Sequence, residues 1–314
     1  MTAAGVVLLL PGQGSQKAGM GADLADRHAP ARDVFQAADA ALGFSLSTLC
    51  FEGPDDELTR TQNAQPALLA HAAAAWAAVC GAARPHVRAA AGHSLGEFTA
   101  YHVAGALPLA DAVSLVRRRG ELMAESGVAR PGAMAAILGL GEEAVEAACR
   151  AAGDTGVVVP ANYNAPDQLV ISGEVEAVER AMTLAKDAGA KRAIRLKVSG
   201  AFHSPLMAVA ADGLRGALHD ASFVSPSFPI YANVTAQPVI DVTLARRLLL
   251  EQLSAPVRWT ATIRTLSADF PGALFVELGP GAVLTNLVKR IAPGTATATC
   301  GTAAEVDDLL ARLS

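Results

Sequence analysis

The 314-residue sequence predicts an α/β fold, in which a large domain with a central, mostly parallel sheet carries a small inserted domain. Apolar residues make up 52% of the chain and charged residues 18%, which favours a substantial core and argues against disorder. Buried strand patterns alternate with helical patterns up to about residue 126, as in a parallel α/β sheet. From residue 130 the order becomes strand, helix, strand, strand, helix, strand, which is the order of a ferredoxin-like unit.

The elements of the first part of the chain are recognised by continuous apolar runs. "GVVLLL" at 5–10 is β-branched and leucine-rich and stops at Pro11-Gly12, which predicts a strand buried on both faces. Helical patterns follow at 20–42 and 65–82. A second buried strand, at 87–93, leads into helices at 95–106 and 108–126.

The inserted unit is predicted at 128–198, which leaves 1–127 and 199–314 as the large domain. Its elements are expected at 130–140 (strand), 142–152 (helix), 157–162 and 168–172 (strands), 175–188 (helix) and 191–197 (strand). The turn "NAPDQ" suits the hairpin between its middle strands. Two further strands of the large domain are expected at 228–234 and 274–278, and a helix at 282–291.

Charge and composition argue against several classes of protein. A net charge of −5 argues against a nucleic-acid partner, which needs a basic surface. The segment 67–83 is short and alanine-rich, so we expect a buried helix and no membrane span. The first residues, "MTAAGVVLLLPGQG", do not resemble a signal peptide, and four scattered cysteines fit a reducing cytosol. These features predict a cytoplasmic protein.

The pentapeptide Gly92-His93-Ser94-Leu95-Gly96 lies between a predicted strand and a predicted helix. This is the arrangement of a nucleophile elbow, in which a tight turn exposes a serine at the carboxyl edge of a sheet. The glycines leave room where the backbone segments come close, and the helix N-terminus favours an oxyanion. The alternative is a serine packed in an ordinary strand–helix turn.

A serine nucleophile needs a general base, and the chain has seven histidines. His71 and His102 lie in apolar helical patterns, and His28, His86 and His219 have polar or loop neighbours. His93 adjoins the serine, but the elbow is expected to point it the other way. His203, in "SGAFHSPLM", lies where the chain crosses back between the domains, a natural edge for a cleft, and is the best candidate by position.

Six motifs occur in a recognisable order along the chain. They are "LLPGQGSQKAGMG", "GHSLGEF", "RRRGELM", "GAFHSPLM", "QLSAPVRW" and "VELGPGAVLTNL". Together they resemble the malonyl-CoA:acyl-carrier-protein transacylases of bacterial fatty acid synthesis, and the acyltransferase domains of polyketide synthases are similar. The resemblance extends from the first strand to about residue 291. It implies an α/β hydrolase-like large domain with a ferredoxin-like insert.

The resemblance assigns the groups that would make and break the acyl bond. It implies that Ser94 is the nucleophile, that His203 is its general base, and that the backbone carbonyl of Gln252 orients the histidine in place of a carboxylate. The backbone amides of Gln13 and Leu95 would form the oxyanion hole. Without the resemblance, "PGQGSQ" is a flexible turn or a weak phosphate loop, since it lacks the P-loop lysine.

The resemblance also assigns the substrate pocket. Arg119 matches the arginine that binds the malonyl carboxylate, while Arg117 and Arg118 are expected on a solvated helix face. Phe202 would crowd an α-methyl group and so disfavour methylmalonyl. Gln65 matches a pocket residue, and the equally good alternative is a polar cap before a helix starting at 66.

The expected activity is transfer of malonyl from coenzyme A to the phosphopantetheine thiol of an acyl carrier protein, with no metal and no permanently bound cofactor. Alternatives are a transferase serving a polyketide synthase or malonate decarboxylase, a serine thioesterase or hydrolase, and a non-catalytic docking module. We expect a monomer. A basic rim near the cleft could bind the acidic carrier, and its candidates, which are equally candidates for ordinary surface charges, are Lys191, Arg192, Lys289 and Arg290.

Overall fold

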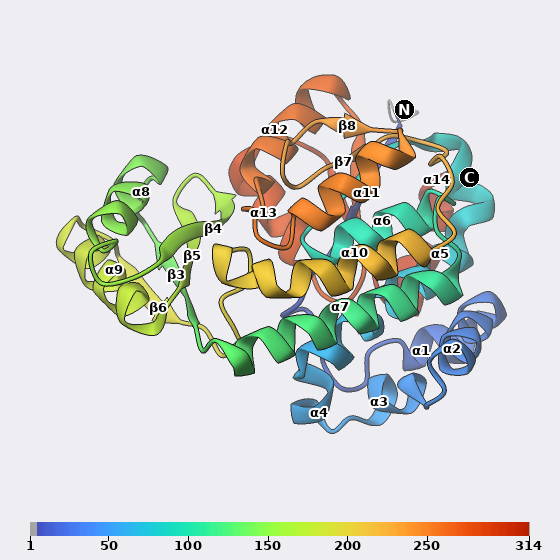
Figure 1. Cartoon of the computed structure of the whole chain (residues 1–314). Coiled ribbons are helices and arrows are strands. Elements are labelled where there is room, and N and C mark those ends of the chain that lie inside the picture. The colour runs from blue at the N-terminus through green and yellow to red at the C-terminus, as the bar shows by residue number, and fades with distance from the viewer. Residues whose placement is uncertain (1–4, 314) are drawn as a thin grey trace.

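The structure is a computed structural model and describes residues 5–313. Residues 1–4, where the signal-peptide prediction begins, lie outside the described part. The large domain is built on a six-stranded sheet (Figure 1). Its strands, in order across the sheet, are β10 (Thr297–Cys300), β9 (Leu274–Leu278), β1 (Val6–Leu10), β2 (Val87–Gly92), β7 (Ile230–Tyr231) and β8 (Pro238–Val239).

The sheet is mostly parallel, as predicted, because only the β7–β8 pair is antiparallel. The central strand β1 is fully buried, and alternate residues enter different cores. Val6 and Leu8 belong to the larger apolar cluster, whereas Val7 and Leu9 belong to a second cluster on the opposite face. The strand expected at 228–234 is shorter than predicted, since only the two residues of β7 pair.

Helices surround this sheet. They are α1 (Ala22–Arg27), α2 (Ala29–Leu42), α3 (Leu46–Glu52), α4 (Asp55–Thr59), α5 (Thr61–Ala83), α6 (Leu95–Val103), α7 (Leu109–Ala129), α10 (Ala211–Asp220), α11 (Val242–Glu251), α12 (Trp259–Asp269), α13 (Val283–Ile291) and α14 (Ala303–Leu313), with short 3-10 helices at Arg84–His86 and Pro205–Ala210. Three of the four cysteines are buried and Cys80 is partly buried, and all four are free thiols.

Two helix predictions need correction. The single helix expected at 20–42 is two helices, α1 and α2, with His28 in an extended conformation between them. Pro30 explains the break, because its ring would clash with the carbonyl of the preceding turn and it has no N–H to donate. The helix expected from 65 begins four residues earlier, at Thr61.

The apolar helix α5 lies in the core. With the turn that follows it, α5 forms the segment Thr61–His86, which is long and apolar enough to cross a membrane and whose most apolar 18-residue window has a mean hydropathy of 1.5. However, 72% of its most apolar window is buried inside the protein, where α5 packs against α2, α6 and α7. This placement fits the core helix that the sequence predicts.

The small domain has a four-stranded antiparallel sheet with its own apolar core. Its elements are β3 (Ala133–Leu138), α8 (Glu142–Ala151), β4 (Val158–Ala165), β5 (Gln168–Gly173), α9 (Val175–Asp187) and β6 (Arg192–Arg195). The strand order across the sheet is β4-β5-β3-β6, and both helices lie on the side facing away from the large domain (Figure 1). The predicted α/β class, with a mostly parallel sheet and a ferredoxin-like unit, is confirmed.

Backbone segments approach closely where the chain passes between the two domains and where the small sheet meets the large domain. At the chain crossings, Gly127 of α7 lies so close to the return segment that an added Cβ would stand 1.9 Å from the Ser199 carbonyl oxygen. Where the small sheet meets the large domain, the Tyr163 amide of β4 donates to the Val257 carbonyl at 2.9 Å, and the Val257 amide donates to the Ala161 carbonyl at 2.8 Å. The boundaries at 127/128 and 198/199 stay a prediction.

Candidate active site

Ser94 occupies a strained turn between β2 and α6. Its backbone has φ 53° and ψ −106°, a conformation that non-glycine residues rarely adopt. A Cβ on Gly92 would lie 1.8 Å from the Gly96 carbonyl carbon, and one on Gly96 would lie 1.9 Å from the Leu10 carbonyl oxygen. Both glycines are therefore required by the close approach of the backbones, as the elbow prediction expects.

Asn233, which no sequence motif predicted as a site residue, holds this turn in place. Its side chain is fully buried; Oδ1 accepts a hydrogen bond from the Ser94 amide at 2.7 Å, and Nδ2 donates to the Gly92 carbonyl at 2.6 Å. It follows β7, which pairs with β2 in parallel, so the carboxyl ends of the two strands meet at one edge.

The structure brings Ser94 and His203 together. The serine Oγ lies 2.7 Å from His203 Nε2, and His203 Nδ1 lies 2.9 Å from the Gln252 backbone carbonyl. Because a carbonyl can only accept, Nδ1 carries the proton and Nε2 is free to accept the serine proton. Burial, followed by the charge of Arg119, lowers the pKa of His203 to about 3. The imidazole is therefore neutral over the physiological pH range.

Arg119 points from α7 into the same site. It is 1% exposed, and its Nη2 lies 3.1 Å from Ser94 Oγ and 3.0 Å from Gln252 Oε1. Its Nη1 donates to Gln65 Oε1 at 2.7 Å, and the guanidinium lies over the Phe98 ring. Burial lowers its pKa only to about 10, so it remains a cation at neutral pH.

Gln65 is part of this site and is not a helix cap. It lies inside α5, is 1% exposed, and its amide bridges Arg119 and the Met123 sulfur. Of the two interpretations that the sequence left open, the pocket residue fits the geometry. The capping alternative fails because α5 begins before Gln65.

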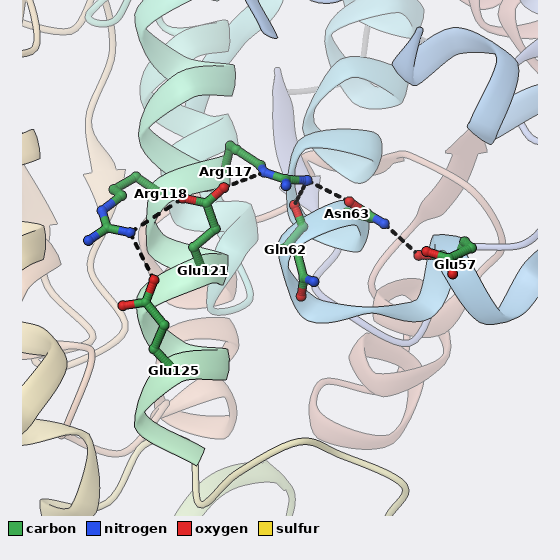
Figure 2. A network of polar contacts seen from close by, with 7 residues as sticks. All are labelled: Glu57, Gln62, Asn63, Arg117, Arg118, Glu121 and Glu125. Atoms are coloured by element: carbon green, nitrogen blue, oxygen red, sulfur yellow. Dashed lines mark hydrogen bonds and ion pairs between the residues drawn. The ribbon is translucent and has the colours of Figure 1, made fainter. Parts of the chain in front are cut away.

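The two neighbouring arginines, Arg117 and Arg118, contact a separate set of polar groups (Figure 2). Arg118 is solvated, as expected, and pairs with Glu121 and Glu125. Arg117 is more buried than expected: its Nη1 donates to the Gln62 carbonyl at 3.2 Å and to Asn63 Oδ1 at 2.5 Å. Since Pro66 cannot donate to the Gln62 carbonyl, Arg117 satisfies a group that the helix leaves open.

Gln65, Ser94, Arg119 and His203 line a cavity of about 420 Å³ between the two sheets. The large domain contributes Gln13, Ser94, Leu95, Arg119 and His203, and Phe202 lines the wall with 6% of its surface exposed. The small domain contributes residues of β3, β4 and β5 and the exposed Lys197. A larger hollow of about 570 Å³ lies beside α8 and β4 but contains none of the predicted site residues.

The remaining histidines are only partly as expected. His71 is buried, while His86 and His219 are exposed. The expectation that His93 points away from the site is wrong, because it lines the cavity and its Nε2 lies 2.7 Å from Asn164 Oδ1. His28 is less solvated than expected, with 17% of its side chain exposed.

Two further findings bear on ligands. Within residues 5–313, no three His, Cys, Asp or Glu side chains are grouped so that they could hold a metal ion.

Of the basic-rim candidates, Arg290 forms an ion pair with Asp167 and a 2.5 Å hydrogen bond to Gln168. It therefore connects α13 to the β4–β5 hairpin of the small domain.

Comparison with known families decides the class of this site. A profile of the family described as "Acyl transferase domain" matches residues 7–304. The chain belongs to the acyl transferase family. Among the relatives of this acyl transferase, the malonyl CoA-acyl carrier protein transacylase of Bacillus subtilis is 44% identical over 288 residues, 91% of this chain and 90% of the relative. The Escherichia coli protein of the same name is 43% identical over 286 residues, 90% of this chain and 91% of the relative.

Solved structures of acyl transferases agree with this one over nearly the whole chain. The acyl-carrier-protein-S-malonyltransferase from Bartonella henselae has a TM-score of 0.94 at 41% identity, covering 98% of this chain and 99% of that one. A malonyl-transacylase solved in complex with a type II polyketide synthase acyl-carrier protein has a TM-score of 0.93 at 40% identity, with the same coverage. The two-domain architecture is therefore that of solved malonyltransferases.

Proposed function

We propose that this acyl transferase moves malonyl from coenzyme A to the phosphopantetheine thiol of an acyl carrier protein, for fatty acid synthesis. One observation supports this above all: a serine–histidine pair and a buried guanidinium meet in one cavity. The Ser94 hydroxyl lies 2.7 Å from the His203 imidazole and 3.1 Å from Arg119 Nη2. Relatives of more than 40% identity carry the malonyl transacylase name.

In the first half-reaction, His203 accepts the Ser94 proton as Oγ attacks the thioester carbonyl. A C–O bond forms, and the C–S bond to coenzyme A breaks. The protonated Nε2 returns its proton to the departing thiolate, so the products are a malonyl-serine ester and free coenzyme A. The Gln252 carbonyl keeps Nδ1 protonated and the ring oriented throughout.

In the second half-reaction, the carrier's phosphopantetheine thiol attacks the malonyl-serine ester. His203 now accepts the thiol proton and donates it to the Ser94 oxygen as the ester breaks. Each tetrahedral intermediate carries a negative oxygen, and the backbone amides of Gln13 and Leu95 are the proposed donors to it. Both residues line the cavity, and Leu95 begins α6, so its amide lies at the positive end of the helix.

Arg119 is proposed to bind the free carboxylate of the malonyl group. A guanidinium and a carboxylate form paired charge-assisted hydrogen bonds, which an acetyl group cannot reproduce. Binding an acetyl group would leave the buried cation without its anion. Phe202, beside the general base, is proposed to exclude substrates with an α-methyl branch, and Gln65 to orient the guanidinium.

A serine thioesterase or hydrolase is the main alternative, since it would use the same elbow. Such enzymes orient the histidine with a carboxylate, whereas here His203 Nδ1 faces a backbone carbonyl. A buried guanidinium next to the nucleophile also favours an acyl group with a carboxylate. The carrier that accepts the malonyl group, whether from fatty acid or polyketide synthesis, is a finer choice, and we assign the fatty acid type by resemblance.

We further propose that the enzyme acts in the cytoplasm as a monomer, with malonyl-CoA as substrate and no permanently bound cofactor. The acyl carrier protein is its macromolecular partner. The chemistry described needs only side chains and backbone amides of this chain. The mass of the protein in solution, measured by light scattering, tests the monomer.

The covalent intermediate can be observed directly. Incubation with malonyl-CoA, without carrier, should add the mass of one malonyl group to the protein. Ser94→Ala should abolish this adduct, whereas Ser172→Ala, which removes a buried hydroxyl on β5, should leave it unchanged. An adduct that persists in Ser94→Ala disproves the nucleophile, and coenzyme A release that continues without carrier shows a hydrolase.

A further inference from the structure

Glu97 is a buried carboxylate at the site that the proposed mechanism does not use. It lies in the first turn of α6 and has no exposed surface, yet it does not line the cavity. Burial raises its pKa to about 7, against the effect of hydrogen bonds and of the Arg119 charge. A buried ionisable group is costly unless its partners compensate, so its contacts indicate its role.

A single oxygen of Glu97 makes both of its hydrogen bonds. Oε2 accepts from Gln252 Nε2 at 2.6 Å and from the Asn233 backbone amide at 3.1 Å, while Oε1 has no hydrogen-bond partner within residues 5–313. Asn233 in turn holds the Ser94 amide. Glu97 therefore accepts hydrogen bonds from Asn233, which holds the Ser94 turn, and from Gln252.

The Gln252 side chain has a direction that matters for Arg119. Its Nε2 donates to Glu97 and, at 3.0 Å, to the Ser94 carbonyl, which leaves Oε1 to accept from Arg119 Nη2 at 3.0 Å. The reversed amide would present NH₂ to a guanidinium, which has only donors. Oε2 of Glu97, which also accepts from the Asn233 amide, and the Ser94 carbonyl are both acceptors, so together they select the amide orientation in which oxygen faces the arginine.

Arg119 depends on neutral oxygen atoms for its position. No carboxylate oxygen within residues 5–313 forms an ion pair with it, and its hydrogen-bond partners are Gln65, Gln252 and Ser94. Arg119 Nη2 donates both to the Gln252 side-chain oxygen and to the Ser94 hydroxyl. If that oxygen were lost, Nη2 would no longer be held beside the reacting atom.

We propose that Glu97 is a positioning residue for substrate selection: it orients the Gln252 amide, which directs the Arg119 guanidinium to the place of the malonyl carboxylate. This inference rests on the proposed function. It explains why a carboxylate is buried three residues after the nucleophile without contacting it. It also separates two roles of Gln252, whose backbone carbonyl orients His203 and whose side chain orients Arg119.

The test compares acylation by malonyl-CoA and acetyl-CoA in Glu97→Gln. The new amide can donate as well as accept, so one of the two acceptors that select the orientation of Gln252 is lost and only the Ser94 carbonyl remains. We expect the ratio of kcat/KM for malonyl-CoA over acetyl-CoA to fall roughly tenfold, mainly through KM for malonyl-CoA. The matched control is Glu277→Gln, which alters an equally buried glutamate that holds the Leu284 and Thr285 amides, does not line the cavity and should keep the wild-type ratio.

A double-mutant cycle shows whether Glu97 acts through Gln252. Gln252→Met removes the amide but keeps the backbone carbonyl, so it should lower the ratio as Glu97→Gln does, and the double variant should be no worse than Gln252→Met alone. If Glu97→Gln does not fold, an unchanged ratio in Gln252→Met overturns the inference by itself. Equal losses for both thioesters in Glu97→Gln also overturn it, whereas a wild type that forms no malonyl adduct refutes the proposed function instead.

Discussion

Ser94 and His203 share an uncommon backbone conformation. Their φ values are 53° and 57°, in the left-handed region where non-glycine residues are strained. Each is held by a hydrogen bond from elsewhere in the chain, Ser94 through Asn233 and His203 through the Gln252 carbonyl. Strain that the surroundings maintain in this way is typical of functional sites, and it fixes the serine–histidine geometry before substrate binds.

Replacing Arg119 with alanine should change the choice of substrate more than the chemistry. The serine and histidine keep their contact, so acetyl transfer should continue, while malonyl loses its charged partner. We expect the malonyl-to-acetyl ratio of kcat/KM to fall by about tenfold or more, the cost of a charge-assisted hydrogen bond. Arg118→Ala, at a solvated position next to it, is the control. A parallel fall in both rates would contradict a carboxylate-binding role.

The pH dependence of acylation follows from His203. Its pKa is lowered from 6.5 to about 3, so the imidazole is a free base at all pH values above that range, and activity is lost only as pH falls through the lowered pKa. Single-turnover acylation should therefore show no loss attributable to His203 near pH 6.5. Because the Arg119 charge contributes to the shift, Arg119→Ala should move the acid limb to higher pH. Because burial raises the pKa of Glu97 to about 7, an acid limb near 6.5 would show a solvated histidine only if it persists in Glu97→Gln.

At the scale of elements, α7 and the segment carrying His203 approach each other through a glycine. An alanine Cβ at Gly127 would stand 1.9 Å from the Ser199 carbonyl oxygen, only a few residues before the general base. Gly127→Ala should therefore lower Tm and kcat together, although alanine favours an isolated helix. Gly216→Ala is the control: it lies on α10 with nothing within 4 Å, so it should raise stability by about 0.5–1 kcal/mol. Full activity in Gly127→Ala would show that the crossing can relax.

Patterns local to the chain predicted the elements, and contacts from distant segments account for the differences. The apolar runs predicted β1, β2 and β9 nearly to the residue, because a strand buried on both faces has a continuous pattern. The start of α5 was misplaced because Pro66 is typical of a first turn. Arg117, from a helix some fifty residues later, satisfies the carbonyl that the proline leaves open.

The same distinction applies to the site. Ser94 could be predicted from the five residues around it, and His203 from its place at the domain crossing. Asn233 and Glu97 could not be predicted in this way. Asn233 reaches Ser94 because the ends of two parallel strands meet, and Glu97 matters because the buried Gln252 amide needs an acceptor. The motifs assigned Gln252 through its backbone alone, and its side-chain role required the three-dimensional contacts.

On the scale of the whole molecule, the cavity lies between two sheets that have separate cores. The proposed nucleophile and base and the buried guanidinium all come from the large domain, and the small domain closes the opposite wall. Arg290 and the Val257 backbone connect the two domains near the cavity. The thioester is therefore enclosed from both sides, which limits the access of water to the acyl-serine.

The overall charge of the molecule gives a last prediction about substrate entry. The chain carries a net charge of −5, so its general field does not attract coenzyme A, which is polyanionic. Apart from Arg119, the only cation other than histidine among the cavity-lining residues of the described chain is Lys197, which is exposed and has no ion pair within residues 5–313. Its place at the cavity suits the phosphate of the pantetheine arm, which coenzyme A and the carrier share.

Lys197→Glu should raise KM for malonyl-CoA about threefold to tenfold with little change in kcat, and the effect should shrink as salt is added. Lys186→Glu makes the same change in net charge on α9, away from the cavity, and should leave KM unchanged; equal effects of the two variants would assign the change to the overall field of the protein.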